Sequence, residues 1–195
     1  SGASKDSALL GGRFNYDFLG KYLFEANLRY NGSSRFARGY RWGVFPSFSA
    51  GWRVSEENFW SEMKDVIPNL KLRGSWGQLG NQNTLTGYYP SQSTVNLGTN
   101  YIFNKAIASG AAITEMANSI ISWETTTMTN IGVDFNIFNK FDVSAEYYYR
   151  QTDDILLTLD IPLIIGLSAP SQNAGKVENK GWDFSTTYND RFGDF

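Results

Sequence analysis

The chain of 195 residues contains no cysteine and no histidine. The absence of cysteine excludes a disulfide and a thiolate metal site. The absence of histidine removes the commonest general base and the commonest transition-metal ligand, so a Ser-His-Asp triad and a histidine-based zinc site are excluded. Asp153, Asp154 and Glu178 lack the spacing of a calcium-binding loop, and nothing in the sequence places Glu124 and Glu146 at the separation of a glycosidase pair. We therefore expect no metal, no cofactor and no enzymatic activity in this stretch of protein.

Strong charge of one sign and long apolar runs are also missing. The net charge is -2, which offers no electrostatic basis for binding nucleic acid. The most apolar stretch, residues 155–167, is interrupted by Asp160 and Pro162 and is shorter than the roughly 20 apolar residues of a membrane-spanning helix. Only 5 residues are proline, whereas 19 are glycine and 16% are aromatic. This composition favours an all-β protein.

Seven segments alternate between apolar and polar residues, the pattern of β-strands that present a different environment to each face. These segments are residues 12–18, 21–30, 47–54, 69–79, 123–137, 141–155 and 181–189. Residues 1–11 are interpreted as a lead-in to the first strand. A short amphipathic helix is predicted near residues 56–65, because Ser55 precedes two glutamates and Pro68 ends the apolar spacing.

The predicted connections are sorted by length. The first, third and fifth strands are followed by tight turns or by the short helix. The second, fourth and sixth are followed by long irregular stretches, residues 31–46, 80–122 and 159–177. Short turns at one end and long loops at the other are typical of an up-and-down transmembrane β-barrel. We therefore expect an antiparallel barrel wall of about seven or eight strands. A soluble β-sandwich, which would bury the aromatic faces against a second sheet, remains the alternative.

An ordered series of motifs resembles the SusC/RagA family of TonB-linked outer-membrane proteins. The series comprises the stretches 29–36 (RYNGSSRF), 41–43, 45–47, 49–53, 69–73, 77–81, 123–126, 130–135 and 173–182. The resemblance implies that residues 12–195 are part of a TonB-dependent receptor-type barrel domain of about 22 strands, with the plug and the N-terminal domains absent from this sequence. It also implies a place in the outer membrane of a Gram-negative bacterium, in contact with membrane lipid.

In function, the resemblance implies a transporter that imports nutrients such as oligosaccharides or peptides. Its expected partners are a SusD-like surface lipoprotein and TonB, which would act through the absent N-terminal part. The competing function is that of a soluble all-β carbohydrate-binding module.

Aromatic and basic residues supply the candidate contact sites. Loop aromatics could stack on substrate or pack against a partner, or could fold the loop on itself; they are Trp42, Tyr88, Tyr89 and Tyr101. Three loop arginines could grip an anionic group or carry solvated charge; they are Arg35, Arg38 and Arg41. Aromatics beside the short turns could form an interfacial girdle or ordinary strand packing; they are Phe18, Tyr22, Phe138, Phe141 and Phe192.

Overall fold

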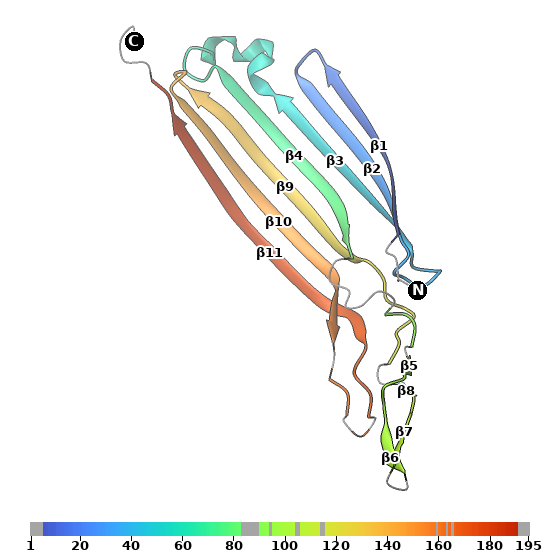
Figure 1. Cartoon of the computed structure of the whole chain (residues 1–195). Helices are drawn as coiled ribbons and strands as arrows, with labels where there is room; N and C mark the ends of the chain where they lie inside the picture. The colour runs from blue at the N-terminus through green and yellow to red at the C-terminus, as the bar shows by residue number, and fades with distance from the viewer. Residues whose placement is uncertain are drawn as a thin grey trace.

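Seven long strands form one antiparallel sheet in which each strand pairs with the next long strand along the chain (Figure 1). The computed structural model describes residues 6–82, 90–93, 95–103, 106–113, 116–158, 160–162, 164 and 166–190. The seven strands are β1 (Ser7–Phe18), β2 (Tyr22–Ser33), β3 (Trp42–Arg53), β4 (Asn69–Asn81), β9 (Glu124–Ile137), β10 (Phe141–Thr158) and β11 (Ser171–Tyr188). This order confirms the predicted all-β, up-and-down arrangement.

The strand register places apolar and polar side chains on opposite faces of this sheet. One row of directly paired residues crosses all seven strands as Phe18, Tyr22, Trp52, Leu72, Val133, Ala145 and Phe184. Three residues further along, on the opposite side, the row is Asn15, Glu25, Ser49, Ser75, Asn130, Tyr148 and Gly181. Because side chains alternate along a strand, these rows define an apolar face and a polar face.

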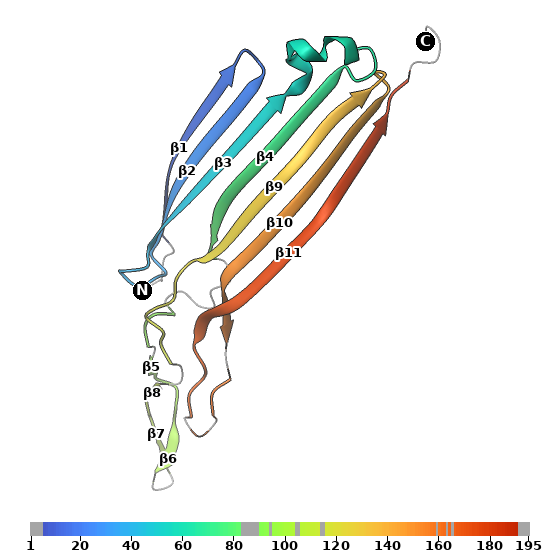
Figure 2. The same ribbon diagram turned by 180° about the vertical axis from the view of Figure 1, so that it is seen from behind.

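The connections are sorted between the two ends of the sheet as predicted (Figures 1 and 2). One end, the short-turn end, holds the β1–β2 turn, the β9–β10 turn and the helical connection between β3 and β4. Its two tight turns use left-handed residues, with φ of 54° at Leu19, 67° at Gly20, 51° at Phe138 and 55° at Asn139. Such φ values suit the twist of antiparallel hairpins. The other end, the long-loop end, holds the ends of the strands that the three long connections join: β2 and β3, β4 and β9, and β10 and β11.

Several predicted boundaries were wrong because the strands extend beyond the stretches in which apolar and polar residues alternate. β1 begins at Ser7, so part of the expected lead-in is strand, and β3 begins at Trp42 inside the expected second loop. β11 begins at Ser171, ten residues before the predicted start, although its first half is Asn-, Lys- and Glu-rich. These segments pair with neighbouring strands through their backbone, which needs no apolar period.

The two irregular regions also differ from expectation. The predicted helix consists of two 3₁₀-helices, η1 (Val54–Glu56) and η2 (Asn58–Met63), separated by an extended Glu57. Residues 80–122, predicted as one irregular loop, contain β5 (Val95–Asn96) paired with β8 (Ala112–Ile113), and β6 (Tyr101–Phe103) paired with β7 (Ala106–Ala108). These two ribbons form an arm that extends beyond the long-loop end of the sheet (Figures 1 and 2).

Buried residues gather at the long-loop end, whereas most of the sheet is a single exposed layer. Phe36, Phe45, Ile121 and Trp123 form the buried cluster, and Leu156 packs against it. A β-sandwich would need a second sheet over the apolar face. Within the described ranges the only other sheets are the two ribbons of the arm. Of the described helices, none has the length and apolar character needed to cross a membrane.

The exposed apolar face and the two edge strands, β1 and β11, predict self-association of the chain on its own. Unpaired strand edges and large apolar surfaces both favour aggregation in water. We expect light scattering to show oligomers when the purified chain is refolded in plain buffer, and detergent to reduce them. A compact monomer that is stable without detergent would contradict this reading.

Candidate functional site

Trp42 lies on the wall rather than in a loop. It is the first residue of β3, and its ring stacks on Tyr30 with centroids 4.7 Å apart and planes 11° apart. A side chain at Gly32 would collide with this ring, because an added Cβ would lie 2.5 Å from it. Trp42 and Tyr30 therefore form an aromatic pair on the apolar face, at the long-loop end of the sheet. The other side of Trp42 remains accessible, with 51% of the residue exposed.

The other candidate aromatics are not brought to Trp42. Tyr101 belongs to β6, on the arm, and is exposed. Tyr88 and Tyr89 lie outside the described residues. The arm exposes further apolar side chains, chiefly the cross-strand pair Ile102 and Ile107, which are each 77% exposed. The arm therefore carries exposed apolar surface at the long-loop end, and Tyr101 is part of it.

Two of the three loop arginines hold the loop together. Arg35 is buried, and its guanidinium donates a 2.9 Å hydrogen bond to the carbonyl oxygen of Gln82 in the next long connection. Arg41 donates from Nε to the carbonyl oxygen of Phe36 at 3.1 Å. Arg38 is exposed. Neither predicted role, binding an anionic group or carrying solvated charge, fits Arg35. Its side chain is buried beside Phe36, and its hydrogen bond to Gln82 ties two loops together.

Asn173 fastens the end of the longest connection to the wall, a role the sequence did not reveal. Its side-chain oxygen accepts from the backbone nitrogen of Ser122 at 2.9 Å, and its side-chain nitrogen donates to the carbonyl oxygen of Ser122 at 3.1 Å. The same nitrogen reaches the carbonyl oxygen of Asp154 at 2.8 Å. Asp154 has a φ of 58° at a β-bulge in β10. The bulge and Asn173 together position the chain just before β9.

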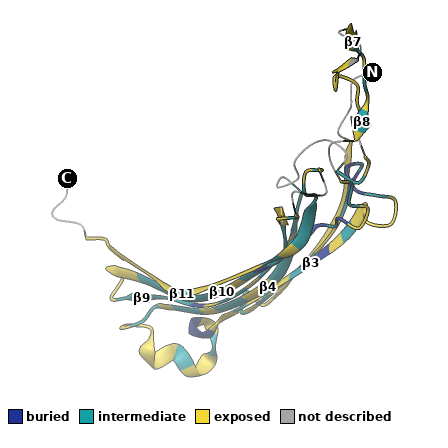
Figure 3. Ribbon diagram, turned by 90° about the horizontal axis from the view of Figure 1, so that it is seen from below, coloured by how far each residue is buried: buried dark blue, intermediate teal, exposed yellow. Residues whose placement is uncertain are grey.

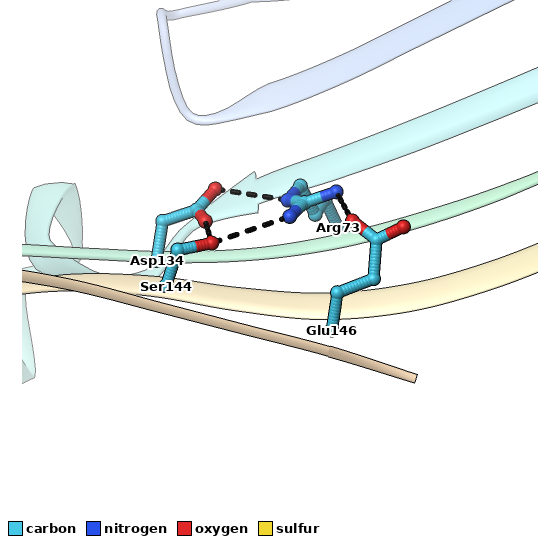
Figure 4. A network of polar contacts seen from close by, with 4 residues as sticks. All are labelled: Arg73, Asp134, Ser144 and Glu146. Atoms are coloured by element: carbon cyan, nitrogen blue, oxygen red, sulfur yellow. Dashed lines mark hydrogen bonds and ion pairs between the residues drawn. The ribbon is translucent and has the colours of Figure 1, made fainter. Parts of the chain in front are cut away.

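An ion-pair network crosses three strands on the polar face (Figure 4). Arg73 of β4 donates from Nε to Asp134 of β9 at 3.0 Å, and from its two terminal nitrogens to Glu146 and Ser144 of β10. Ser144 in turn donates to Asp134 at 2.7 Å. Gly132, opposite Arg73 on β9, leaves room for the guanidinium, since a Cβ there would lie 2.8 Å from it. The network fastens the centre of the sheet.

A shallow concavity of about 530 Å³ lies beside this network. Its polar lining comes from five strands and includes Asp17, Glu25, Ser49, Arg73 and Asn130. Charged groups of both signs line it, which suits water or a polar molecule better than an apolar ligand. Among the residues described, no group of three or more acidic side chains could hold a metal ion.

At the short-turn end, Glu57 ties the helical connection to aromatic residues of the wall. Its Oε1 accepts hydrogen bonds from the Tyr22 hydroxyl at 2.7 Å and from Trp52 Nε1 at 3.2 Å, and its Oε2 accepts from Lys21 Nζ at 3.1 Å. The hydrogen bonds from Tyr22, Lys21 and Trp52 lower the pKa of Glu57 below its ordinary value of 4.5. The Glu57 carboxylate thus accepts hydrogen bonds from the polar groups of two aromatic side chains, Tyr22 and Trp52.

Of the predicted girdle residues, Phe18 and Tyr22 lie in an aromatic row at the short-turn end, and Phe138 and Phe141 lie at the β9–β10 turn of the same end. Tyr16, Phe18, Tyr22 and Trp52 follow one another with ring centroids 6.4 to 6.5 Å apart. On β10 and β11, at the same end and on the same apolar face, the ring centroids of Phe141 and Tyr188 lie 4.9 Å apart. Phe138 is exposed in its turn, and Phe192 lies outside the described residues. Their arrangement fits a girdle.

Removing the charge of Arg73 should destabilise the sheet by leaving Asp134 and Glu146 facing each other without a cation. In the full-length protein we expect Arg73→Met to cost about 1–3 kcal/mol, measured as a lower denaturant midpoint. Arg73→Lys, which keeps the charge, should cost less. Glu146→Gln should restore part of the loss in the Arg73→Met background. Equal midpoints for the two Arg73 variants, or no rescue, would contradict the role of the network.

Acid should loosen the helical connection through Glu57. Because its pKa is lowered in the folded state, the stabilisation is complete above the ordinary pKa and is lost as the pH falls through the folded value. A fluorophore on Ser61→Cys should show falling anisotropy on acidification. Glu57→Gln should give low anisotropy throughout the same pH range, whereas Glu62→Gln, the control on the same segment, should keep the pH dependence. The reading fails if Glu57→Gln leaves the wild-type profile unchanged.

Comparison with known proteins places this sheet in a family. The family model described as "TonB dependent receptor-like, beta-barrel" matches residues 2–195. The TonB-dependent receptor SusC of Bacteroides thetaiotaomicron is 39% identical over 178 residues, which cover 89% of this chain and 18% of SusC. TonB-dependent receptor P39 of Formosa agariphila is 38% identical over 174 residues, which cover 89% of this chain and 16% of P39. The chain thus spans less than a fifth of these relatives.

Solved structures show the same fold. The RagAB peptide importer in its closed-closed state matches 96% of this chain and 20% of its own, with a TM-score of 0.83 and 26% identity. The siderophore receptor PirA from Pseudomonas aeruginosa matches 92% of this chain with a TM-score of 0.61 at 14% identity, a likeness of fold alone. The chain therefore belongs to the TonB-dependent receptor-like β-barrel family, and within that family it is similar to SusC and to the RagAB importer.

Proposed function

We propose that this chain is part of the barrel wall of an outer-membrane transporter that imports a nutrient, an oligosaccharide or a peptide, into a Gram-negative bacterium. The observation that carries the proposal is the sorting of the seven-strand sheet into an apolar and a polar face by the pairing of its strands. A barrel strand in a membrane presents one face to lipid and the other to the lumen, while its backbone groups pair with neighbouring strands.

Exposure supports this assignment of the two faces. Large apolar side chains on the apolar face remain open on the interior strands β3, β4 and β9, with Phe48 45%, Trp76 37% and Ile131 64% exposed. An exposed apolar surface of this extent needs a non-aqueous environment to cover it, and membrane lipid supplies that environment. The polar face, with its ion pairs and its concavity, would line the lumen. This role uses binding and shape and requires no catalytic residue in the chain.

The arm supports contact with a partner at the cell surface. Ile102, Ile107 and Leu97 expose three-quarters or more of their surface on ribbons that extend beyond the wall (Figure 1). In the proposed transporter this surface meets a SusD-like lipoprotein, and TonB acts through a part of the protein outside this chain. Tyr101, beside these residues, is a candidate contact for that partner or for the substrate, and Trp42 lies at the wall beneath them.

Deleting the gene for the full-length protein tests the import function. We expect the deletion strain to lose growth on one substrate class when oligosaccharides and peptide mixtures are supplied separately as limiting nutrients, and the wild-type gene to restore it. The protein should remain with the outer membrane after carbonate extraction. Unchanged growth on every substrate, or release of the protein into the soluble fraction, would overturn the proposal.

Variants of the arm test the partner contact separately. Ile102→Asp and Ile107→Asp should reduce recovery of a lipoprotein partner with the full-length receptor, because each places a charge in an apolar contact. Asn100→Asp adds the same charge at a polar residue of the arm and should leave recovery unchanged. Equal recovery with all three variants would show that this surface does not carry the contact.

A further inference from the structure

The helical connection, residues 54–67, lies on the side of the sheet that carries the apolar face. Glu57 takes its hydrogen bonds from Tyr22 and Trp52, both of which project from that face. Figure 3 shows the connection beside the convex side of the curved sheet. The chain could have crossed from β3 to β4 at the tip of the sheet, as the β9–β10 turn does. The connection instead projects outward from the sheet, beside Tyr22 and Trp52 of the aromatic row.

The connection is held firmly while its large apolar side chains face away from the protein. Val54 and Ser55 are buried, Trp60 donates from Nε1 to the carbonyl oxygen of Ile67 at 3.0 Å, and the carbonyl oxygen of Val66 accepts from the backbone nitrogen of Phe138 at 2.9 Å. Three side chains nevertheless remain exposed: Phe59 by 67%, Met63 by 45% and Val66 by 44%. A pinned segment that presents apolar residues indicates a contact surface.

The charges of this segment exclude electrostatic attraction to an anionic surface as the basis of that contact. Residues 54–67 contain the acids Glu56, Glu57, Glu62 and Asp65 and a single base, Lys64. Glu56 lies 3.8 Å from Lys64, and Glu57 pairs with Lys21 at 3.1 Å. The surplus is negative, so binding must come from apolar area. The segment is also continuous with the apolar face, because Glu57 accepts hydrogen bonds from Tyr22 and Trp52. The helical connection and the apolar face therefore contact the same surroundings.

We propose that the helical connection is an interfacial anchor, which lies in the headgroup region of the lipid leaflet at the short-turn end and inserts Phe59, Met63 and Val66 toward the acyl chains. The proposal rests on the proposed function, in which lipid covers the apolar face. Apolar side chains on a short helical segment bind at this depth through buried area, and aromatic residues favour the same zone. The anchor would fix how deeply the wall sits in the membrane, with Glu57 setting its angle.

Fluorescent labels on introduced cysteines test the anchor, since this chain has no cysteine of its own. The full-length receptor, with any other cysteine replaced, is labelled with the environment-sensitive dye NBD at Phe59→Cys or Met63→Cys and reconstituted in zwitterionic phospholipid vesicles. Phe184→Cys on the apolar face serves as the lipid control. Thr187→Cys, on the polar face near the same end, serves as the control away from lipid. Heat-modified gel mobility reports folding of each variant.

We expect the labels at 59 and 63 to emit at shorter wavelength than the label at 187, to be quenched by lipid-attached nitroxide and to be protected from iodide. Quenching by iodide at 59 and 63, with lipid quenching intact at 184, would overturn the anchor and leave the proposed function standing. Protection from both quenchers would show that protein covers the segment, which also overturns the anchor. Loss of lipid quenching at 184 would contradict the proposed function itself.

Discussion

The continuous hydrogen-bonded ladder between neighbouring strands is the constraint on which the rest of this structure depends. The register runs from β1 to β4 and on to β9, β10 and β11, and it keeps apolar side chains beside apolar ones across the sheet. A slip of one residue in any pair would move every side chain of a strand to the wrong face. The ladder also gives every interior strand a hydrogen-bonded neighbour on each side, and such pairing is a condition for any structure that crosses lipid.

Polar contacts at three levels hold the register in place. Arg73 joins three strands across the polar face, Glu57 fastens the helical connection to Tyr22 and Trp52, and Asn173 fastens the end of the longest connection to β11. The buried cluster around Phe36 and Trp123 adds apolar packing at the long-loop end. The single-layer sheet thus gains its fixed shape from contacts at its two ends and its centre, while its broad faces remain available to their surroundings.

The fold could be predicted from the sequence where one face of a strand is apolar, because alternation is then visible. It could not be predicted where strands are polar on both faces, as at Gly32 and Ser33 or in the first half of β11, since only backbone pairing defines them there. The burial of Arg35 was not foreseen because its partner, the carbonyl oxygen of Gln82, lies in a different loop. Glu57 was expected near a helix start, but its pairing with β2 depends on the turn geometry. The candidate contacts remain predictions.

The central claim is that the two faces of this sheet meet lipid and lumen. A scan of single nitroxide labels at consecutive positions 181–188 of β11, in the full-length receptor in a lipid bilayer, tests it most directly. The account predicts that accessibility to oxygen peaks at the even positions, where Trp182, Phe184 and Tyr188 lie, and that accessibility to a water-soluble relaxing agent never peaks there. Accessibility without a two-residue period, or with oxygen peaks at the odd positions, would contradict it.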